Sequence, residues 1–518
     1  MLGPGAADSD RQELQEAEAN VEGVLASIKD LEQEMMAAAG LTEEMIQVIE
    51  AERQRKWLDP VDRSQRGTVT GEQVETTDLA EDVLPSALEA LLARVDRVWL
   101  REQTALGCRL GAQFLSEPLS ILRGIRIASE VRPIHRFAQM LLVAEDFLEE
   151  RLDYDRFSGA LLIPQTAALG SRIGDLTQVA GEVNERVEAL WRLPSTMTDS
   201  TVYELLVAAT SARLGRRVEF LEAGRAGTGV KIPDLRLHDY SFPFVIECKR
   251  KQLVTEADFD EEARMRALFA ELRIECLRRG LFGLFKVRFE VEPEAIPIRA
   301  VVEAAVQQRL TPHPERYTAY GWGRIAYHPL PSVLDTPVTP LYSPLFLQRV
   351  FGWDSDLPPQ DGLICQVDQT GEMLVDRVRA PLGFVWTNES PTVFRRRART
   401  AAALFASAIR QIPAGEMGAV YICYQEGDRE QVADDRVEYL RQQMRGWEHS
   451  SNIRVPLIVM SRIVPRALDH GRPDLVETAM PFVSELTGGS VWIEDLPTTV
   501  FTTSRRHRVA AERIGPAQ

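Results

Sequence analysis

Two carboxylates and one amine occur at a spacing that suits two neighbouring strands. Asp234 follows Pro233 at the predicted start of one strand, and Glu247 and Lys249 lie on the next predicted strand. Alternate residues of a strand share a face, so Glu247 and Lys249 project together while Cys248 points the other way into the core. We expect the two strands to bring both carboxylates and the amine to one point.

This set of groups has the chemistry that hydrolysis of a phosphodiester requires. Carboxylate oxygens hold Mg²⁺, the bound ion polarises a water, and a cation near that water stabilises the developing charge. Lysine suits the last task because its compact amine shifts its proton affinity when partly buried, whereas arginine stays protonated. Of the 60 basic residues only six are lysines, and among these only Lys249 has an acidic residue two places earlier.

An upstream helix containing Glu204, in the stretch TVYELLVAA, completes a pattern that resembles the PD-(D/E)xK nuclease superfamily, with its restriction-endonuclease-like fold. The predicted order of helix, three strands and helix between residues 200 and 280 is similar to the core of that superfamily. The resemblance implies a central mixed sheet flanked by helices, and Mg²⁺ as the cofactor, with Mn²⁺ as a substitute. The metal ligands that it implies are Asp234, Glu247, Glu204 and the backbone carbonyl of Cys248, and it implies that Lys249 assists the attacking water.

The resemblance also implies a metal-dependent deoxyribonuclease, since most proteins of this superfamily cut DNA. By analogy we expect a role in a prokaryotic restriction or anti-phage defence system, with companion defence proteins as partners. One alternative is a non-catalytic subunit that binds nucleic acid or assembles a complex. Another is a phosphate-ester hydrolase that acts on nucleotides or RNA through the same residues.

Each candidate residue also has a purely structural interpretation. Glu204 lies three places after Thr201, so the two could form a helix capping box. Asp234 could cap a turn after its proline, and residues 249–251 could be a solvated strand end. His238 lies about four residues along the strand from Asp234, roughly 13 Å away, and we interpret it as a surface histidine.

Composition and charge limit the classes of partner. The chain has 518 residues, 45% hydrophobic and 26% charged, which is typical of a globular protein. Its net charge of −17 means that any nucleic-acid site must be locally basic. Two arginine-rich clusters could bind a phosphate backbone. The first could instead be a solvated helix face and consists of Arg395, Arg396, Arg397 and Arg399. The second could instead be a flexible tail and consists of Arg505, Arg506, His507 and Arg508.

We expect a cytoplasmic protein without membrane contact. No run approaches the roughly 18–20 apolar residues of a membrane span. The five cysteines are widely spread with no CxxC pair, so we interpret them as buried thiols in a reducing compartment. The glycine-rich run at 224–229 lacks the ending of a phosphate-binding loop and is predicted to be a hairpin loop.

The pattern along the chain predicts a mostly α-helical N-terminal region followed by an α/β nuclease domain. The amino-terminal heptad-like seam at 14–35 indicates either a dimerisation hairpin or a helix that packs on its own chain. Further helices are expected at 86–104, 134–152, 169–190, 256–279, 398–411 and 429–444, and strands at 218–222, 234–238, 244–249, 285–291, 418–424 and 455–463. Residues 311–345 carry seven prolines and are expected to be irregular. The predicted divisions are a helical hairpin at 1–58, a linker at 59–84, a helical domain at 85–194, the first part of the nuclease core at 195–300, a proline-rich insertion at 301–390, and the α/β completion with a C-terminal tail at 391–518.

Overall fold

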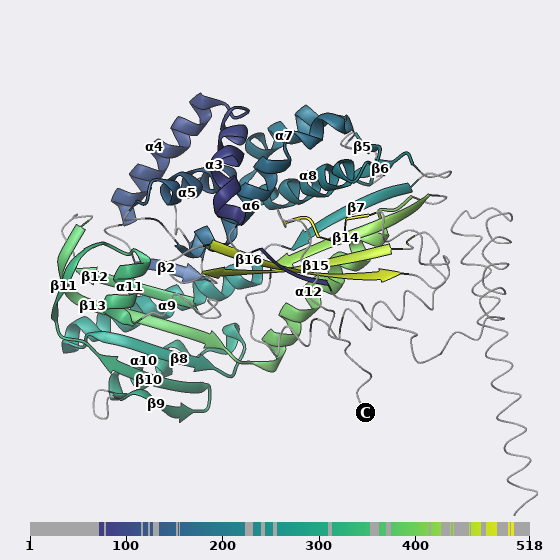
Figure 1. Cartoon of the computed structure of the whole chain (residues 1–518). Helices are drawn as coiled ribbons and strands as arrows, with labels where there is room; N and C mark the ends of the chain where they lie inside the picture. Colours follow the sequence, from purple (N-terminus) through teal and green to yellow (C-terminus); the bar gives the residue numbers. More distant parts are fainter. Residues whose placement is uncertain are drawn as a thin grey trace, which may run out of the picture.

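The structure is a computed structural model of the chain, and it describes residues 72–76 and most of 79–501. Within the longer span the description leaves out 115–117, 123–124, 128–133, 152–153, 155, 223–231, 240–243, 252–255, 309–312, 353–361, 369–373, 414–415, 426–435, 437–438, 440–454, 456, 468–472, 484–495 and 498. The described chain is a mixed α/β structure with two mixed sheets (Figure 1).

The first sheet contains the strands that carry Asp234 and Glu247. Its strands, in spatial order, are β1 (Glu72–Thr76), β16 (Pro473–Val483), β15 (Leu457–Ala467), β14 (Met417–Gln425), β7 (Phe244–Lys251), β6 (Leu235–Leu237), β5 (Val218–Phe220) and β4 (Ala180–Gly181). Strand β14 is parallel to both β7 and β15, whereas β5, β6 and β7 form an antiparallel run.

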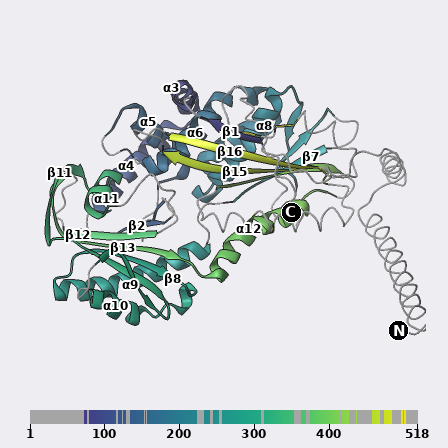
Figure 2. The same ribbon diagram turned by 60° about the horizontal axis from the view of Figure 1, so that its bottom comes forward.

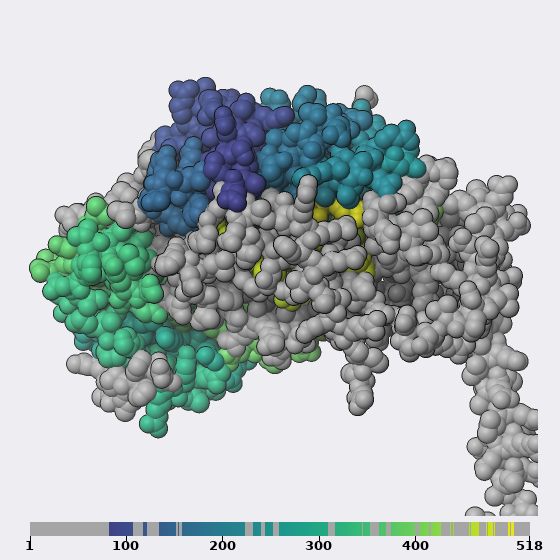
Figure 3. Space-filling model, in the orientation of Figure 1, coloured from purple at the N-terminus to yellow at the C-terminus, as the bar shows by residue number. Residues whose placement is uncertain are grey.

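Helices cover both faces of this sheet. One face packs against α3 (Leu79–Leu92), α5 (Arg136–Leu148), α6 (Arg156–Arg172), α7 (Val183–Arg192) and α8 (Thr198–Arg213) in the largest hydrophobic core. Helix α4 (Arg97–Phe114) lies beside them, and Figure 3 shows this helical layer along the top of the molecule. The opposite face packs against α12 (Pro391–Ile409), which Figure 2 shows on the side of the sheet away from α6 and α8.

The second sheet is built almost entirely from the segment between β7 and α12. Its path is β3 (Ile125–Ile127), β2 (Leu119–Leu122), β12 (Gly362–Asp368), β13 (Leu374–Asn388), β8 (Gly283–Phe289), β10 (Gly323–Pro329) and β9 (His313–Tyr320), with β11 (Val333–Pro340) paired to β13. Helices α9 (Glu256–Arg279) and α10 (Ile298–Gln307) pack on one face, and α11 (Pro344–Phe351) packs on the other. Helix α9 therefore belongs to the second sheet, and α12 is the helix that leads back to the first.

The described elements confirm most of the predicted strands and helices after residue 195, including the helix at 256–279. The prediction of an irregular segment at 311–345 was wrong, because it forms β9, β10, β11 and the start of α11. Its prolines sit where a strand or helix tolerates them: Pro329 and Pro340 end their strands and Pro344 opens α11. Pro337 lies between Asp335 and Thr339, where the pairing of β11 with β13 shifts register.

Two predicted helices are interrupted. The helix predicted at 86–104 ends at Leu92 and restarts at Arg97, because the Asp96 carboxylate accepts the backbone N–H of Val98 at 2.8 Å and so begins a new helix. The helix predicted at 169–190 divides into the end of α6, a 3-10 turn at 175–178, β4 and α7. Gly181 has a φ of 85°, which a helix cannot accommodate.

Several predictions lie outside the described residues: the seam at 14–35, the loop at 224–229 and the basic cluster at 505–508. Of the predicted helix at 429–444, only Arg436 and Tyr439 are described, and both are helical. Cys248, Cys276, Cys365 and Cys423 are buried and form no disulfide, as predicted. None of the helices in the described part of the chain combines the length and apolarity that a bilayer crossing requires.

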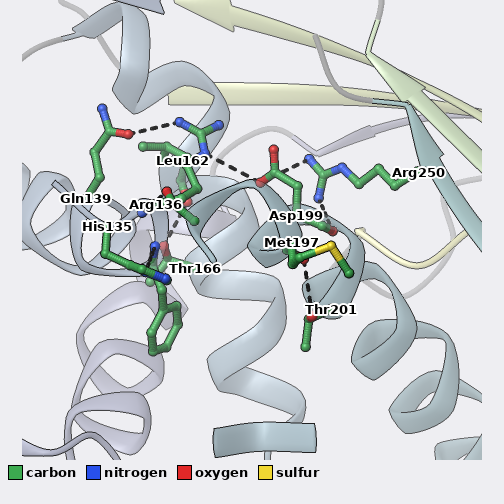
Figure 4. A network of polar contacts seen from close by, with 11 residues as sticks. His135, Arg136, Gln139, Leu162, Thr166, Met197, Asp199, Thr201 and Arg250 are labelled. Carbon is green, nitrogen blue, oxygen red and sulfur yellow. Dashed lines mark hydrogen bonds and ion pairs between the residues drawn. The ribbon is translucent and has the colours of Figure 1, made fainter. Parts of the chain in front are cut away.

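A buried polar network joins β7 to the helical layer (Figure 4). The Asp199 carboxylate, at the start of α8, lies 3.5 Å from Nε of Arg136 and 3.9 Å from a guanidinium nitrogen of Arg250. Arg250 also donates a hydrogen bond to the backbone carbonyl of Asp199 at 3.1 Å, and Arg136 donates to Gln139 at 3.0 Å. Burial raises the pKa of Asp199, but the charges of Arg250 and Arg136 outweigh it and lower the pKa overall.

We predict that Asp199→Asn destabilises the protein by about 3 kcal/mol, because it leaves the buried guanidinium of Arg250 and the partly buried one of Arg136 without their counter-charge. The folded-state pKa of Asp199 lies below its unfolded value, so its contribution is present above about pH 4 and is lost as the pH falls through the folded-state pKa. Thermal unfolding at a series of pH values measures this: the difference between wild type and variant should be full at pH 7 and shrink in acid.

The matched control is Asp335→Asn, which removes an ion pair to Arg377 from a carboxylate that is 77% exposed. We expect a change within about 0.5 kcal/mol there. Equal losses for the two variants would contradict a structural role specific to Asp199.

Candidate functional site

The pairing of β6 with β7 ends one residue after Asp234 on β6 and one residue before Glu247 on β7. Leu235 pairs with Ile246, and the backbone N–H of Asp234 donates to the Ile246 carbonyl at 3.1 Å. Asp234 directly precedes the last pair of β6, and Glu247 directly follows Ile246, so the two carboxylates lie on neighbouring strands at the same end of the pairing. The sequence predicts that they meet at one point, and this remains a prediction.

The two faces of β7 have different surroundings. Phe244, Ile246 and Cys248 belong to the core that contains the helical layer, whereas Val245 belongs to the core that contains α12. Glu247 and Lys249 share the face of Val245, as the alternation predicted. The Lys249 ammonium forms an ion pair with Glu247, whose side chain is 1% exposed against 23% for the lysine.

Strand β7 continues past the start of β6, and beyond that point the side chain of Asp234 accepts a hydrogen bond from β7. The backbone N–H of Cys248 has no β6 residue opposite it and instead donates to Oδ2 of Asp234 at 2.8 Å. In an antiparallel strand the N–H and C=O of one residue point to the same side. The Cys248 carbonyl therefore points toward the Asp234 carboxylate as well.

Glu204 approaches from α8, on the helical side of the sheet. Its carboxylate forms a 2.9 Å ion pair with Arg186 of α7, and Arg186 also donates to the Leu221 carbonyl at 3.2 Å. The N–H of Leu221 in turn donates to the backbone carbonyl of Asp234 at 3.1 Å. The charges of Asp234 and Glu247 both act on Glu204, and we call these three acids the carboxylate cluster.

Crowding of these acids shows in their proton affinities. Burial, followed by the charge of Asp234, raises the pKa of Glu204 to about 8, and Glu247 adds to the rise against the opposing charges of Arg186 and Lys249. Burial also raises the pKa of Asp234, despite the Cys248 hydrogen bond and the charges of Lys249 and Arg186. Burial alone would lower the pKa of Lys249, but Glu247 and Asp234 raise it, so this amine is protonated at neutral pH.

The structural alternatives are resolved by these contacts. Helix α8 begins at Thr198, and the Thr201 hydroxyl donates to the Met197 carbonyl, so Thr201 and Glu204 do not form a capping box. Asp234 bonds across to β7 instead of capping a turn. The side chain of Arg250 is only 3% exposed, which excludes a solvated strand end.

His238 lies apart from the carboxylate cluster. It is exposed and contacts Glu219 at 2.7 Å, which confirms the prediction of a surface histidine. Sequence reasoning missed Arg186, the main cationic partner of Glu204. Arg186 is 18 residues from Glu204 on a different helix, and no spacing rule connects the two.

Within the described residues, no three or more histidine, cysteine, aspartate or glutamate side chains converge closely enough to hold a metal ion. Each member of the carboxylate cluster instead has its own donor: Arg186, the Cys248 amide or Lys249. The donor set nevertheless suits a hard divalent cation, because three carboxylates and one carbonyl are all oxygen ligands. Burial is the largest cause of the raised pKa values of Glu204 and Asp234, and a bound divalent cation would favour their charged forms.

Comparisons with known proteins add nothing to this geometry: a scan of protein-family models and searches of curated proteins and of solved structures each find no match.

We predict that Asp234→Asn raises thermal stability in the presence of a chelator by about 0.5–2 kcal/mol, because it removes a charge that burial disfavours. The folded-state pKa of Asp234 is raised, so its stabilising effect is highest below the unfolded pKa and is lost as the pH rises through the folded-state value. The gain should therefore be full at neutral pH and vanish in acid, as measured by calorimetry.

Asp239 provides the matched control, five residues away. Burial alone would raise the pKa of Asp239, but the hydrogen bonds and charge of Arg217 together outweigh it and lower the pKa, so Asp239→Asn should lower stability at neutral pH. A loss of stability in Asp234→Asn of the same sign would refute the idea of a charge-crowded site.

Proposed function

We propose that this protein is a metal-dependent nuclease that hydrolyses phosphodiester bonds of DNA. The observation that supports the proposal is the position of Asp234 and Glu247 on neighbouring strands at one end of the β6–β7 pairing, with Lys249 paired to Glu247 and Glu204 in electrostatic contact with both acids. A scaffold protein gains no stability from crowding buried carboxylates, since the charge of each raises the free energy of the others.

The arrangement of elements supports the same proposal. Helix α8 precedes the antiparallel run β5, β6 and β7, and α12 then leads to β14, which is parallel to β7. This is the order expected of a restriction-endonuclease-like core, with the second sheet inserted between β7 and α12. The inserted sheet and its helices have their own hydrophobic cores, so the insertion leaves the first sheet continuous.

Mg²⁺, or Mn²⁺ in its place, would be held by Asp234, Glu247, Glu204 and the Cys248 carbonyl, and would supply a polarised water and charge neutralisation. The rest of the chemistry falls to the chain. Lys249 is protonated and held beside Glu247, so it can donate a hydrogen bond to the attacking water or to a phosphate oxygen. Arg186 holds Glu204 in position through its ion pair.

A role in prokaryotic restriction or anti-phage defence, in the cytoplasm and with companion proteins, is part of the same proposal and rests on analogy with the superfamily. A non-catalytic nucleic-acid-binding or scaffold subunit is the second candidate. Two observations favour it. Lys249 and Arg186 form ion pairs with Glu247 and Glu204, and the described side chains form no metal-binding group.

We predict that the full-length protein degrades plasmid or linear DNA with Mg²⁺ or Mn²⁺, and that Asp234→Ala and Lys249→Met each lower the rate at least about 100-fold. The reasons are loss of a ligand in the first case and loss of the cation beside the water in the second. Gel-based cleavage assays measure the rate, and a Mn²⁺-dependent rise in melting temperature, present in wild type and absent in Asp234→Ala, measures ion binding separately.

Asp239→Ala and Lys286→Met are the matched controls, because they remove the same side chains at positions away from the carboxylate cluster. Their rates should stay near that of wild type. Equal rates in all five proteins would assign any activity to another site or a contaminant. A folded wild-type protein that cuts neither DNA nor RNA with either ion would favour the scaffold.

A further inference from the structure

A basic groove lies along the first half of α12. It has a volume of about 340 Å³ and is lined by Thr392, Arg395, Arg396 and Arg399. We call it the α12 groove. The stems of these side chains form most of its lining, and their polar ends lie toward its rim. An adjoining hollow shares Thr392 and Arg395 and is also lined by Glu290, Glu292 and Glu294.

Two of these arginines lack a carboxylate partner among the described residues. Arg395 donates from Nε to the backbone carbonyl of Pro391 at 3.2 Å, and the guanidinium of Arg399 lies 5.2 Å from the centre of the Tyr439 ring. Both side chains are exposed. Their terminal nitrogens remain available to an external anion, and a guanidinium stacked on an aromatic ring keeps its in-plane donors available.

Arg397, on the same helical turn, has a different task. It forms ion pairs with Asp258 at 3.3 Å and Glu261 at 3.1 Å, two buried acids of α9, and is only 13% exposed. The structure therefore uses one arginine of the cluster to anchor α12 to α9 and directs the others to the groove. Like charges gathered around one groove repel each other, which a bound polyanion would relieve.

The topology brings the α12 groove to the level of Lys249. Ala408 of α12 shares a core cluster with Val245, so the second half of α12 covers the beginning of β7. Ile412, just after α12, lies near Val245 as well, because a side chain added at Gly418 would touch both. The helix leads to the start of β14, parallel to β7, and therefore runs in the opposite direction to β7.

Distances along the two elements match. Four residues of strand from Val245 to Lys249 span roughly 13 Å, and nine residues of helix from Ala408 back to Arg399 also span roughly 13 Å. Lys249 points to the face of the sheet that α12 covers, since it shares that face with Val245. Arg399 thus lies near the height of Lys249, with Arg395 one turn beyond it.

We propose that the α12 groove binds the phosphate backbone of DNA, next to the carboxylate cluster. This inference rests on the proposed function for the identity of the polyanion, and adds the surface that holds it. Arginine forks match phosphate oxygens in pairs, and the Thr392 hydroxyl adds a donor. A protein with a net charge of −17 repels DNA over most of its surface, so binding depends on such a local basic groove.

The test measures binding of a fluorescently labelled DNA duplex by anisotropy, in a chelator so that no cutting occurs, over a series of salt concentrations. The double variant Arg395→Glu and Arg399→Glu should bind at least about tenfold more weakly, and the slope of log affinity against log salt should fall by about 2, for two lost phosphate contacts. The double variant to lysine should keep the slope, because it keeps the charge.

Arg410→Glu is the matched control, since it makes the same charge reversal at an exposed position on the other end of α12. It should leave affinity and slope unchanged. If the folded Arg395→Glu and Arg399→Glu double variant binds DNA with wild-type affinity, the proposal that the α12 groove binds DNA is wrong. It is also wrong if the wild type binds no DNA at low salt.

The two proposals fail separately. If wild type cuts DNA and Lys249→Met does not, but the groove variant binds normally, the nuclease stands and the groove falls. If the groove variant loses binding while wild type never cuts, the groove stands and the nuclease falls.

Discussion

The hydrogen bond from the Cys248 amide to the Asp234 carboxylate is the interaction on which the site depends. It occurs because β7 extends beyond the first residue of β6, so that a backbone donor near the sheet interior needs an acceptor that no strand supplies. A carboxylate at this position satisfies the donor and is held beside Glu247 at the same time. The energetic cost of a buried charge is thus partly offset by a backbone hydrogen bond.

Strand β7 carries charged residues whose side chains alternate between the two faces of the sheet. Arg250 points to the helical layer and is held by Asp199, whereas Lys249 points to the α12 side and is held by Glu247. The acids near β7 also differ: the charges of two arginines lower the pKa of Asp199, whereas burial raises the pKa values of Asp234 and Glu204.

Local patterns were enough to predict much of this. The period of two in residues 244–249 predicted that Glu247 and Lys249 share a face, and their ion pair agrees. The strands at 218–222 and 234–238 were predicted within two residues at each end. What local patterns could not predict are contacts between distant elements, such as Arg186 with Glu204 or Arg397 with α9. The prolines of 311–345 misled because their effect depends on whether a strand lies at an edge, ends, or shifts register, which only pairing decides.

The insertion between β7 and α12 explains how the two halves of the proposed site stay in register. Parallel strands such as β7 and β14 require a crossover connection, and here that connection also contains a whole sheet. A long insertion would leave the first turns of α12 unsupported unless the inserted part held them. The acids of α9 do so through Arg397, and Glu261 also accepts from the buried Trp386 of β13. The second sheet therefore fixes the position of the α12 groove relative to Lys249, although it contributes no residue to either.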